Sequence, residues 1–410
     1  MTKKSDAPAI RFKGFSDAWE QRKLGDIGET YTGLSGKTKA DFGHGQARFV
    51  TYMNVFSNPI SNPEMTEPIE IDPKQNEVEV GDVLFTTSSE TPEEVGMSSV
   101  LLEKRGKTYL NSFCFGFRPS EKIDSYYLAY MLRSESAREK IILLAQGISR
   151  YNISKNKVME IAVSLPSLDE QKLIGQCFRQ LDHLITLHQR KFEKLTNVKK
   201  SMLEKMFPQN GSSYPEIRFK GFTDPWEQRK VGDLLIERNQ QAPMSDEYPL
   251  MAFIANEGVA PKGERYDRSA LVTDTVNKLY KKTEKGDFIY SSNNLETGSI
   301  GLNKYGKACI SPVYSIFEPT GIADSDFLGR RLVRKDFINA MVKWRQGVIY
   351  GQWRIHESDF LKIEITVPSV EEQRKIGAYL DQLDNLITLH QRELEKLQNI
   401  KKSMLEKMFV

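Results

Sequence analysis

The sequence predicts an α/β (α+β) protein in which two globular domains are separated by two long antiparallel coiled-coil helices, with a pseudo-twofold internal repeat. Three observations lead to this prediction: segments copied about 200 residues apart, two proline-free segments with heptad spacing, and short strand signals between them. The chain has 410 residues and is 39% apolar, which is ample for more than one buried core.

The internal repeat consists of two pairs of nearly identical segments. Residues 10–26, which read IRFKGFSDAWEQRKLGD, return as residues 217–233 with 14 of 17 positions identical. Residues 167–207 return as residues 369–409 with 28 of 41 positions identical. Because the segments between them have diverged, we expect the copies to form a common framework and the diverged segments to carry specificity. The order predicts a copied segment with a first diverged domain at 1–166, a first helix at 167–207 and a linker at 208–216. A copied segment with a second diverged domain follows at 217–368, and a second helix at 369–410.

Both long segments carry the signals of a helix start and of a coiled coil. Ser167 lies three residues before Glu170, and Ser369 lies three before Glu372, so we expect capping boxes in which each Ser and each Glu accepts a backbone N–H. Neither segment contains a proline, and Pro208 ends the first. Apolar residues recur in steps of four and three, which predicts a left-handed seam. The seam positions of the first helix are Ile174, Phe178, Leu181, Ile185, His188, Phe192, Leu195, Lys199, Met202 and Met206, and the second helix repeats this spacing.

The two helices are expected to pair with each other, because a solitary helix of this length leaves its apolar stripes exposed. The linker of about ten residues reaches at most about 35 Å at ~3.5 Å per residue. The second copied segment therefore stays near the end of the first helix, which favours antiparallel over parallel pairing. A second apolar stripe is available to another domain or subunit, at Leu184, Leu187, Val198 and Leu203.

The heptapeptide LITLHQR stands at the centre of both long helices, at residues 184–190 and 386–392. In a symmetric antiparallel pair only the centre meets its own copy, so the pseudo-twofold axis is expected there. In one interpretation the two histidines of the heptapeptides fix the register of the seam, and in another they hold a metal or take part in catalysis. The residues predicted near the axis are Leu184, Leu187, His188, Leu386, Leu389 and His390.

Both diverged domains show signals for short strands and short helices. VGDVLFTTSSE (80–90) and KGDFIYSSNNLETGSIG (285–301) each predict a Gly-Asp turn, an apolar strand and a polar loop. A second polar loop follows a Gln-Gly pair in each domain. Arg can pair with guanine, and Asn or Gln with adenine, so these loops are candidates for DNA contact, although such polarity is also typical of ordinary loops. The candidates are Lys37, Arg48, Tyr52, Ser88, Ser89, Arg150, Tyr151, Asn152, Arg265, Ser292, Asn293, Asn294, Tyr350, Gln352, Trp353 and Arg354.

Several chemistries find no complete motif in the sequence. GLSGKT, residues 33–38, has only two residues between its glycines, too few for a phosphate-binding loop. The five histidines form no HExxH and no metal-ligand spacing, and no serine lies in a GxSxG context. IDPKQNEVEV, residues 71–80, predicts a turn followed by a strand rather than a nuclease carboxylate cluster.

Net charge and cysteine usage limit the classes of partner and the cellular location that the sequence predicts. The net charge is +3, and residues 27–165 carry 15 Lys and Arg against 18 Asp and Glu, while residues 234–367 carry 18 against 17. Neither diverged domain is basic, so charge alone does not point to nucleic acid. No secretory signal and no run of 18 apolar residues is present, and the three cysteines form no CxxC pair. We therefore expect a cytoplasmic protein without membrane contact.

The sequence as a whole resembles the specificity subunit of type I restriction–modification systems. The resemblance covers essentially the whole chain. It is carried by the two IRFKGF…WEQRK segments, the strands GDVLFTTSS and GDFIYSSNN, the two QG…LPS/VPS boundaries, and the two LDxLITLHQRxxEKLxNxKKSMLEKMF helices. Two matching halves in this order are a far more specific signal than any single motif.

The resemblance implies two target-recognition domains, each reading one half of an asymmetric bipartite site in double-stranded DNA. It implies helices that set the spacer between the half-sites and dock methyltransferase subunits. It also implies a chain without catalysis or cofactor, whose partners are two adenine-N6 methyltransferase subunits using S-adenosylmethionine and two motor–nuclease subunits using ATP and Mg. Two alternatives remain open: a coiled-coil scaffold without direct DNA readout, and a stand-alone DNA-modifying enzyme with a cryptic site.

Overall fold

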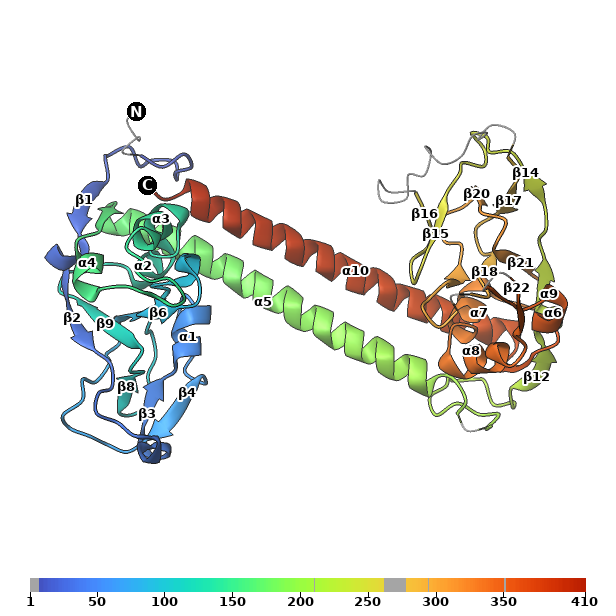
Figure 1. Ribbon diagram of the computed structural model, residues 1–410, viewed down its shortest axis with the longest axis horizontal. Coiled ribbons are helices and arrows are strands. Elements are labelled where there is room, and N and C mark those ends of the chain that lie inside the picture. Colours follow the sequence, from blue (N-terminus) through green and yellow to red (C-terminus); the bar gives the residue numbers. More distant parts are fainter. Residues whose placement is uncertain (1–6, 210, 262–277, 294, 350–351) are drawn as a thin grey trace. The chain divides into compact units, whose positions relative to one another are not determined.

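The computed structural model describes residues 7–209, 211–261, 278–293, 295–349 and 352–410, with side chains in all of these except 347–349 and 352–353. The chain divides into two compact units. Unit 1 comprises residues 1–190 and 391–410, and unit 2 comprises residues 191–390. Each unit therefore contains one copied N-terminal segment, one diverged domain and one part of each long helix (Figure 1).

Unit 1 is built on two small sheets. One consists, in spatial order, of β2 (Gly28–Thr32), β9 (Cys114–Pro119), β5 (Val83–Thr86) and β7 (Ser98–Val100), each antiparallel to its neighbour. The other consists of β4 (Thr66–Ile69), β3 (Phe42–Val50) and β8 (Thr108–Leu110), and here β3 and β8 run parallel. Strand β5 is buried on both faces, because its alternating side chains send Val83 and Phe85 into one apolar cluster and Leu84 into another.

Short helices and single turns connect the strands of unit 1 and cover its core. Three of the helices start at capping side chains, since Thr51, Asp124 and Ser134 accept hydrogen bonds from the N–H groups of Asn54, Tyr127 and Ala137. These elements are η1 (Leu24–Asp26), η2 (Lys39–Asp41), α1 (Tyr52–Ser57), η3 (Pro92–Glu94), α2 (Ser125–Met131), α3 (Glu135–Ile142) and α4 (Lys155–Met159).

Unit 2 repeats the four-stranded sheet of unit 1 although its sequence has diverged. Its strands lie in the order β13 (Leu235–Glu237), β21 (Ser315–Pro319), β18 (Phe288–Tyr290) and β19 (Ile300–Leu302), again all antiparallel. In the second sheet β14 (Gln241–Ala242), β17 (Tyr280–Thr283) and β20 (Ala308–Ile310) pair antiparallel with one another, and the parallel pairing of β20 is limited to one bridge between Leu250 and Cys309. The remaining elements are α6 (Val231–Leu234), α7 (Ser325–Arg331), α8 (Lys335–Val342), α9 (Glu357–Phe360), and the hairpins of β15 (Ala252–Ile254) with β16 (Gly258–Ala260) and of β22 (Gln346–Ile349) with β23 (Gln352–Arg354).

The two long helices, α5 (Leu168–Lys205) and α10 (Val370–Lys407), pair in antiparallel fashion within each unit, as predicted. In unit 1 the start of α5 packs on the end of α10, where the rings of Phe178 and Phe409 stack with centroids 5.6 Å apart. In unit 2 the end of α5 packs on the start of α10, and Lys199 lies 2.5 Å from Asp384. The coiled-coil interpretation of the copied segments is therefore confirmed.

The second apolar stripe of α5 is divided between two environments. Val198 and Leu203 pack against the core of unit 2, whereas Leu184 and Leu187 are exposed in unit 1. The two LITLHQR copies fall mainly in different units, so their meeting at a pseudo-twofold axis stays a prediction.

The predicted capping boxes form only in part. The Oγ atoms of Ser167 and Ser369 accept the expected N–H bonds at 3.4 and 3.5 Å. The carboxylates of Glu170 and Glu372 do not return to the Ser backbone, which was the wrong half of the prediction. Each instead accepts two hydrogen bonds from an arginine of the copied IRFKGF segment, Arg11 and Arg218, at 2.7 and 2.8 Å. A guanidinium supplies two charge-assisted donors, which outcompete one neutral backbone N–H.

The copied N-terminal segments close each unit at a second place. Strand β1 (Glu20–Lys23) pairs with β11 (Ala162–Leu165), and β12 (Glu227–Lys230) pairs with β24 (Glu364–Val367). In addition, the N–H of Ile10 donates to the carbonyl of Lys407 at 3.0 Å, and the N–H of Ile217 donates to the carbonyl of Lys205 at 2.9 Å. The copied segments thus bind the end of a long helix in the same way in both units.

The turn predicted within residues 71–80 is present, since the N–H of Gln75 donates to the carbonyl of Asp72 at 3.2 Å. The strand predicted after it is wrong. The N–H of Glu79 donates to the carboxylate of Asp82 at 2.8 Å, so a side chain takes a backbone donor that a strand needs. Within the part of the chain that the structure describes, no helix is both long enough and apolar enough to cross a membrane.

Candidate nucleic-acid interface

A two-residue ladder brings together the two polar loops predicted in the first diverged domain. Strand β6 (Ser88–Ser89) pairs antiparallel with β10 (Tyr151–Asn152), which places Tyr151 opposite Ser89 and Asn152 opposite Ser88. The hydroxyl of Tyr52 donates to the carbonyl of Ser88 at 2.6 Å and joins α1 to the same ladder. Six candidates that are far apart in the sequence, counting Arg150 beside Tyr151, therefore lie at one place.

The loop that presents Arg150 is tightly closed. Gln146 and Asn152 exchange two backbone hydrogen bonds of 2.8 and 2.9 Å. Gly147 has φ +145°, and a Cβ there would lie 2.0 Å from the carbonyl oxygen of Arg150, so only glycine fits. The loop therefore has one backbone shape, and it carries Ile148 at its tip with 96% of that residue exposed.

An aromatic residue supports Arg150 from a neighbouring turn. The guanidinium carbon of Arg150 lies 5.7 Å from the ring centroid of Phe113, which is 53% exposed. Thr87 fixes that turn, because its N–H and its hydroxyl both donate to the carbonyl of Phe113, at 2.9 and 2.8 Å. Sequence reasoning missed Phe113 and Ile148. The signal was present in Asn-Ser-Phe (111–113) and Gln-Gly-Ile (146–148), where an apolar residue occupies a turn.

The ladder residues divide into floor and surface. Ser88 and Ser89 are buried, and the hydroxyl of Ser89 donates to Glu94 at 3.2 Å. These serines therefore hold the ladder in place and are not presented to a ligand. Arg150 and Asn152 are exposed and present a forked donor and an amide, the groups that recognise guanine and adenine.

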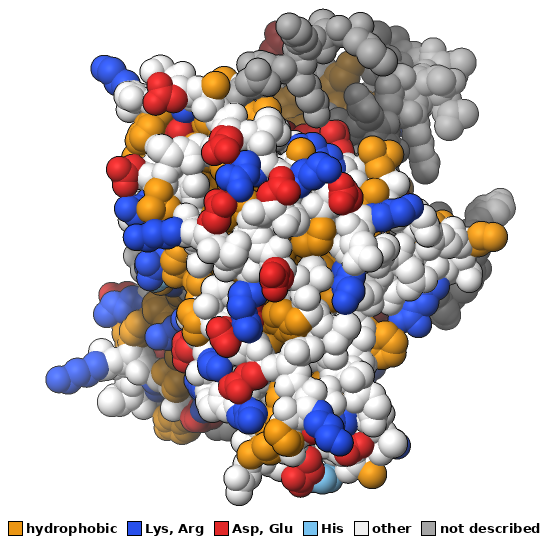
Figure 2. Space-filling view, turned by 90° about the vertical axis from the view of Figure 1, so that its left-hand side faces the viewer, with side chains coloured by type: hydrophobic (Ala, Val, Ile, Leu, Met, Phe, Trp, Pro, Cys, Tyr) orange, Lys and Arg blue, Asp and Glu red, His pale blue; other side chains and the backbone are white. Residues whose placement is uncertain are grey.

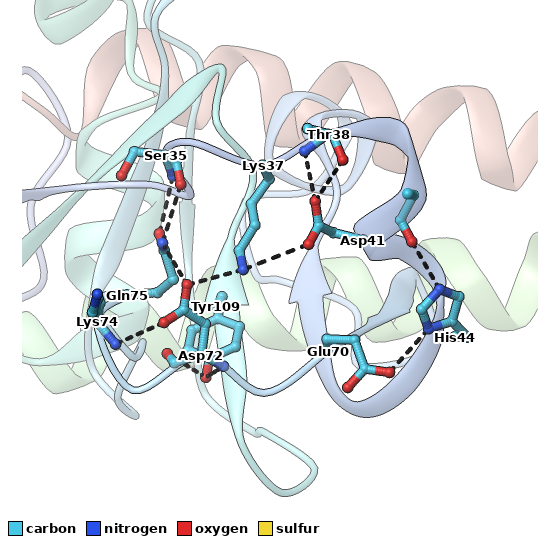
Figure 3. A network of polar contacts seen from close by, with 11 residues as sticks. Ser35, Lys37, Thr38, Asp41, His44, Glu70, Asp72, Lys74, Gln75 and Tyr109 are labelled. Atoms are coloured by element: carbon cyan, nitrogen blue, oxygen red, sulfur yellow. Dashed lines mark hydrogen bonds and ion pairs between the residues drawn. The ribbon is translucent and has the colours of Figure 1, made fainter.

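Two further candidates of unit 1 are turned toward their own domain. The Nζ of Lys37 lies 2.9 Å from Asp72 and 3.9 Å from Asp41, and only 13% of its side chain is exposed. Figure 3 shows this ion pair within a wider polar network. The hydrogen bond from Lys37, joined by those from Lys74 and Gln75, holds the pKa of Asp72 well below its usual range. The lysine of GLSGKT, Lys37, thus forms an ion pair that stabilises its own domain.

Arg48 is likewise bound inside the domain. It lies on β3, and its Nε donates to the hydroxyl of Thr66 at 2.6 Å while its Nη2 donates to the carbonyl of the same residue. The sheet that carries Arg48 is not the β6–β10 ladder, so the fold does not bring Lys37 and Arg48 into the cluster around Arg150.

Unit 2 has a corresponding pair of segments. The loop after β18 contains Ser292, whose hydroxyl accepts the N–H of Ile355 at 3.1 Å, directly after the β22–β23 hairpin. Asn293 in that loop is half-buried. Arg354 ends the hairpin with 66% of its side chain exposed and lies 3.9 Å from Glu357. Arg265, Asn294 and Tyr350 lie outside the described residues, as do the side chains of Gln352 and Trp353.

The electrostatic character of the surface is mixed. On the face of the molecule drawn in Figure 2, Lys and Arg side chains alternate with Asp and Glu side chains. This agrees with the near balance of charge in the sequence. Within the described ranges, no three His, Cys, Asp or Glu residues are grouped so that they could hold a metal ion.

Comparison with known proteins identifies the class to which this architecture belongs. Residues 16–197 and 223–399 match the family described as the type I restriction modification DNA specificity domain. The chain therefore belongs to this family and carries two copies of its domain, and it is a DNA sequence-specificity subunit.

Individual relatives match over most of their length. The chain is 25% identical to a putative type I restriction enzyme MjaX specificity subunit of Methanocaldococcus jannaschii, over 94% of this chain and 92% of that protein. It is also 25% identical to the MjaVIII specificity subunit of the same organism, over 75% and 74%. The crystal structure of a type I restriction–modification S subunit from M. genitalium has the same fold, with a TM-score of 0.58, 15% identity and coverage of 98% and 99%.

Proposed function

We propose that each diverged domain reads one half of an asymmetric bipartite site in double-stranded DNA. The observation that carries this proposal is the recurrence of one design in two unlike sequences. Both units have the same four-stranded order, and both place a polar loop after a buried strand beside a second loop that starts at a Gln-Gly pair and presents an exposed arginine. Two unlike sets of side chains on one scaffold read two unlike half-sites.

In unit 1 the base-reading groups are Arg150 and Asn152, and in unit 2 the corresponding group is Arg354. Arg150 is held between its closed loop and the ring of Phe113, so it loses little side-chain freedom when it binds a base edge. Bidentate contact of this kind discriminates between bases by about 1–3 kcal/mol.

The long helices set the spacer between the half-sites and dock the partner subunits. A helix of 38 residues is about 57 Å long at ~1.5 Å per residue. Leu184 and Leu187 on α5 and their copies Leu386 and Leu389 on α10 are exposed, and they lie outside the heptad seam, on the second apolar stripe that is available to a partner. A cavity of about 630 Å³ beside Leu184, lined also by Gln176, Arg179, Gln180 and His183, lies along this surface in unit 1. We assign these exposed leucines to methyltransferase docking.

The subunit itself performs no catalysis and holds no cofactor. Two methyltransferase subunits supply adenine-N6 methylation with S-adenosylmethionine, and two motor–nuclease subunits supply ATP- and Mg-dependent translocation and cleavage. This division of labour is supported by membership of a specificity family and by the absence of a complete catalytic motif in the sequence. The near-neutral recognition domains leave much of the phosphate neutralisation to the partners.

The proposal is tested by substituting one reading arginine at a time in cells that carry the chain with its own methyltransferase subunits. Methylated adenines are mapped by single-molecule sequencing. Arg150→Ala is expected to relax or abolish recognition of one half-site, and Arg354→Ala that of the other. Arg105→Ala is the matched control, because Arg105 is also exposed but pairs with Glu64 on the surface.

Other results would point to another function. A uniform loss of methylation from both variants would show phosphate contact rather than base reading. An unchanged motif after exchange of residues 27–165 for another such domain would favour a scaffold. Methylation or nicking by the purified chain alone would indicate a stand-alone enzyme.

A further inference from the structure

One carboxylate in unit 1 joins three elements. Asp182 lies on α5 and accepts a hydrogen bond of 2.7 Å from the hydroxyl of Tyr130 on α2. The Nζ of Lys401 on α10 lies 2.5 Å from the same carboxylate, and it also lies 5.5 Å from the centroid of the Tyr130 ring. The three side chains form a closed triangle in which the globular domain contacts both long helices.

Unit 2 contains the same junction with a different donor. Asp384 lies on α10 and accepts a hydrogen bond of 2.9 Å from Arg330 on α7. The Nζ of Lys199 on α5 lies 2.5 Å from it. Asp381, one turn earlier, binds Lys304 at 2.5 Å and strengthens the attachment of the domain. Again one carboxylate links the globular domain to both helices.

The two junctions differ in a way that separates framework from recognition domain. Asp182 and Lys199 are identical to their copies Asp384 and Lys401, and they belong to the repeated helices. Tyr130 and Arg330 belong to the diverged domains, where a phenol has replaced a guanidinium at the corresponding helix. Two unlike donors reach the same carboxylate, so the position of the attachment is preserved while its chemistry is not.

The junctions are too exposed to act mainly by stabilising the fold. About a third of each Asp side chain remains accessible, 31% for Asp182 and 32% for Asp384. Ion pairs with this exposure contribute little to stability. Charged residues that flank a coiled-coil seam and pair across it, as Asp182 and Asp384 do with Lys401 and Lys199, are better known for setting partner choice and orientation. The effect of these carboxylates is therefore expected in the orientation of the attached domain.

We propose that Asp182 and Asp384 are positioning residues that fix the angle at which each recognition domain sits on the helix pair, and thereby the spacer length that the complex accepts. A domain that tilts or turns on the helices presents its reading loops at a different place along the DNA. This inference rests on the proposed function, since it concerns the geometry with which the two half-sites are read.

The experiment compares Asp182→Asn and Asp384→Asn with the natural chain in cells that also carry its methyltransferase subunits. Adenine methylation is measured at two kinds of site: native sites, and sites whose spacer is one base pair shorter or longer. The readout is the ratio of methylation at the altered sites to methylation at the native sites. Each variant is expected to raise this ratio at least about fivefold, with both half-sites unchanged. Asp182→Glu, which keeps the carboxylate, is expected to restore most of the native preference. Asp169→Asn is the control, because Asp169 lies on the same helix and pairs with Lys172 at the surface, where 84% of the Asp169 side chain is exposed.

The outcomes separate the inference from the proposed function. If both Asn variants keep the native ratio while still reading both half-sites, the positioning role is wrong and the function stands. If the natural chain itself directs methylation to no bipartite motif, the function falls first. Should Asp182→Asn abolish all methylation, Tyr130→Phe decides, because it removes only the hydroxyl that reaches Asp182; an unchanged ratio in that variant overturns the proposal.

Discussion

The carboxylates of Glu170 and Glu372 are nearly inaccessible, at 0% and 1% exposure, and each is held by one bidentate arginine from the copied N-terminal segment. Removal of one partner from such a pair leaves a buried charge without compensation. We expect Arg11→Ala to lower the free energy of unfolding of unit 1 by about 3–5 kcal/mol, and Arg218→Ala to do the same in unit 2. Urea unfolding followed by circular dichroism measures the loss.

The matched control for this prediction is the exposed pair of Arg22 and Glu121, at 2.9 Å. Arg22→Ala is expected to change the free energy of unfolding by less than about 1 kcal/mol. An equally small effect of Arg11→Ala would mean that Glu170 is solvated and that the copied segment is held by its strand alone.

Asp72 gives unit 1 a defined response to acid. Its pKa in the folded protein lies well below its usual range because Lys37 donates to it. A group whose pKa is depressed by folding stabilises above its unfolded pKa, near 3.9, and this contribution is lost as the pH falls toward the folded pKa. The melting temperatures of the natural chain and of Lys37→Met are therefore expected to differ most at neutral pH and to converge below about pH 4. Lys39→Met, an exposed neighbour, is the control, and a gap that widens in acid would contradict this account.

At the scale of single elements, the copied helices were the part of the fold that the sequence predicted best. Their heptad spacing depends only on local residue order, so their length and pairing followed from it, and the short reach of the linker indicated the antiparallel direction. The partner of Glu170 did not follow, because Arg11 lies 159 residues away and no local pattern connects them. The strand predicted within residues 71–80 failed for a different reason, since Asp82 accepts the backbone N–H of Glu79 that a strand needs.

A prediction about the long helices follows from their repeat. Insertion of one heptad directly after LITLHQR in both α5 and α10 lengthens the pair by about 10.5 Å while the seam keeps its phase. The spacer of the recognised site is expected to grow by about three base pairs at ~3.4 Å each, with both half-sites unchanged. Methylome sequencing of cells that carry the altered subunit measures the spacer. An unchanged spacer after the heptad insertion would refute the ruler function.

At the scale of the whole molecule, the sequence predicted the two-part plan and located part of the candidate interface. The Gly-Asp strands and the Gln-Gly loops marked the segments that contain Arg150 and Arg354, because turn chemistry is local. Within unit 1, the pairing of the two polar loops through the β6–β10 ladder was not predictable, since Ser88 and Asn152 are far apart in the chain. Lys37 and Arg48 were also among the candidates, and their residue type does not reveal that Asp72 and Thr66 bind them inside the domain.

The equivalent attachment of Ile10 to Lys407 and of Ile217 to Lys205 predicts that the chain tolerates circular permutation. In unit 1, residues 7–9 lie near Phe409 and Val410, with which they line one cavity, so a short linker can span from residue 410 to this segment. A chain that starts at Ser212, ends at Gly211 and joins the natural ends by such a linker is expected to melt within a few degrees of the natural chain and to direct methylation to the same site.

The control for the permutation is a chain opened inside β5, which is fully buried and should not tolerate a break. If the first permutant failed to fold and the second folded, the covalent link at residues 208–216 would be needed in unit 2, although the equivalent attachment of Ile10 to Lys407 in unit 1 has no such link.

The division of the core of unit 1 has a consequence for biosynthesis. Unit 2 is one continuous stretch of chain, whereas the core of unit 1 contains Met408 and Phe409 beside Tyr127 and Phe178. A ribosome therefore completes every residue of unit 2 before it delivers the last pieces of unit 1. The unit that is begun first is therefore the one whose last core residues are synthesised last. A premature stop codon just beyond residue 390 would leave every residue of unit 2 present and unit 1 without its closing residues.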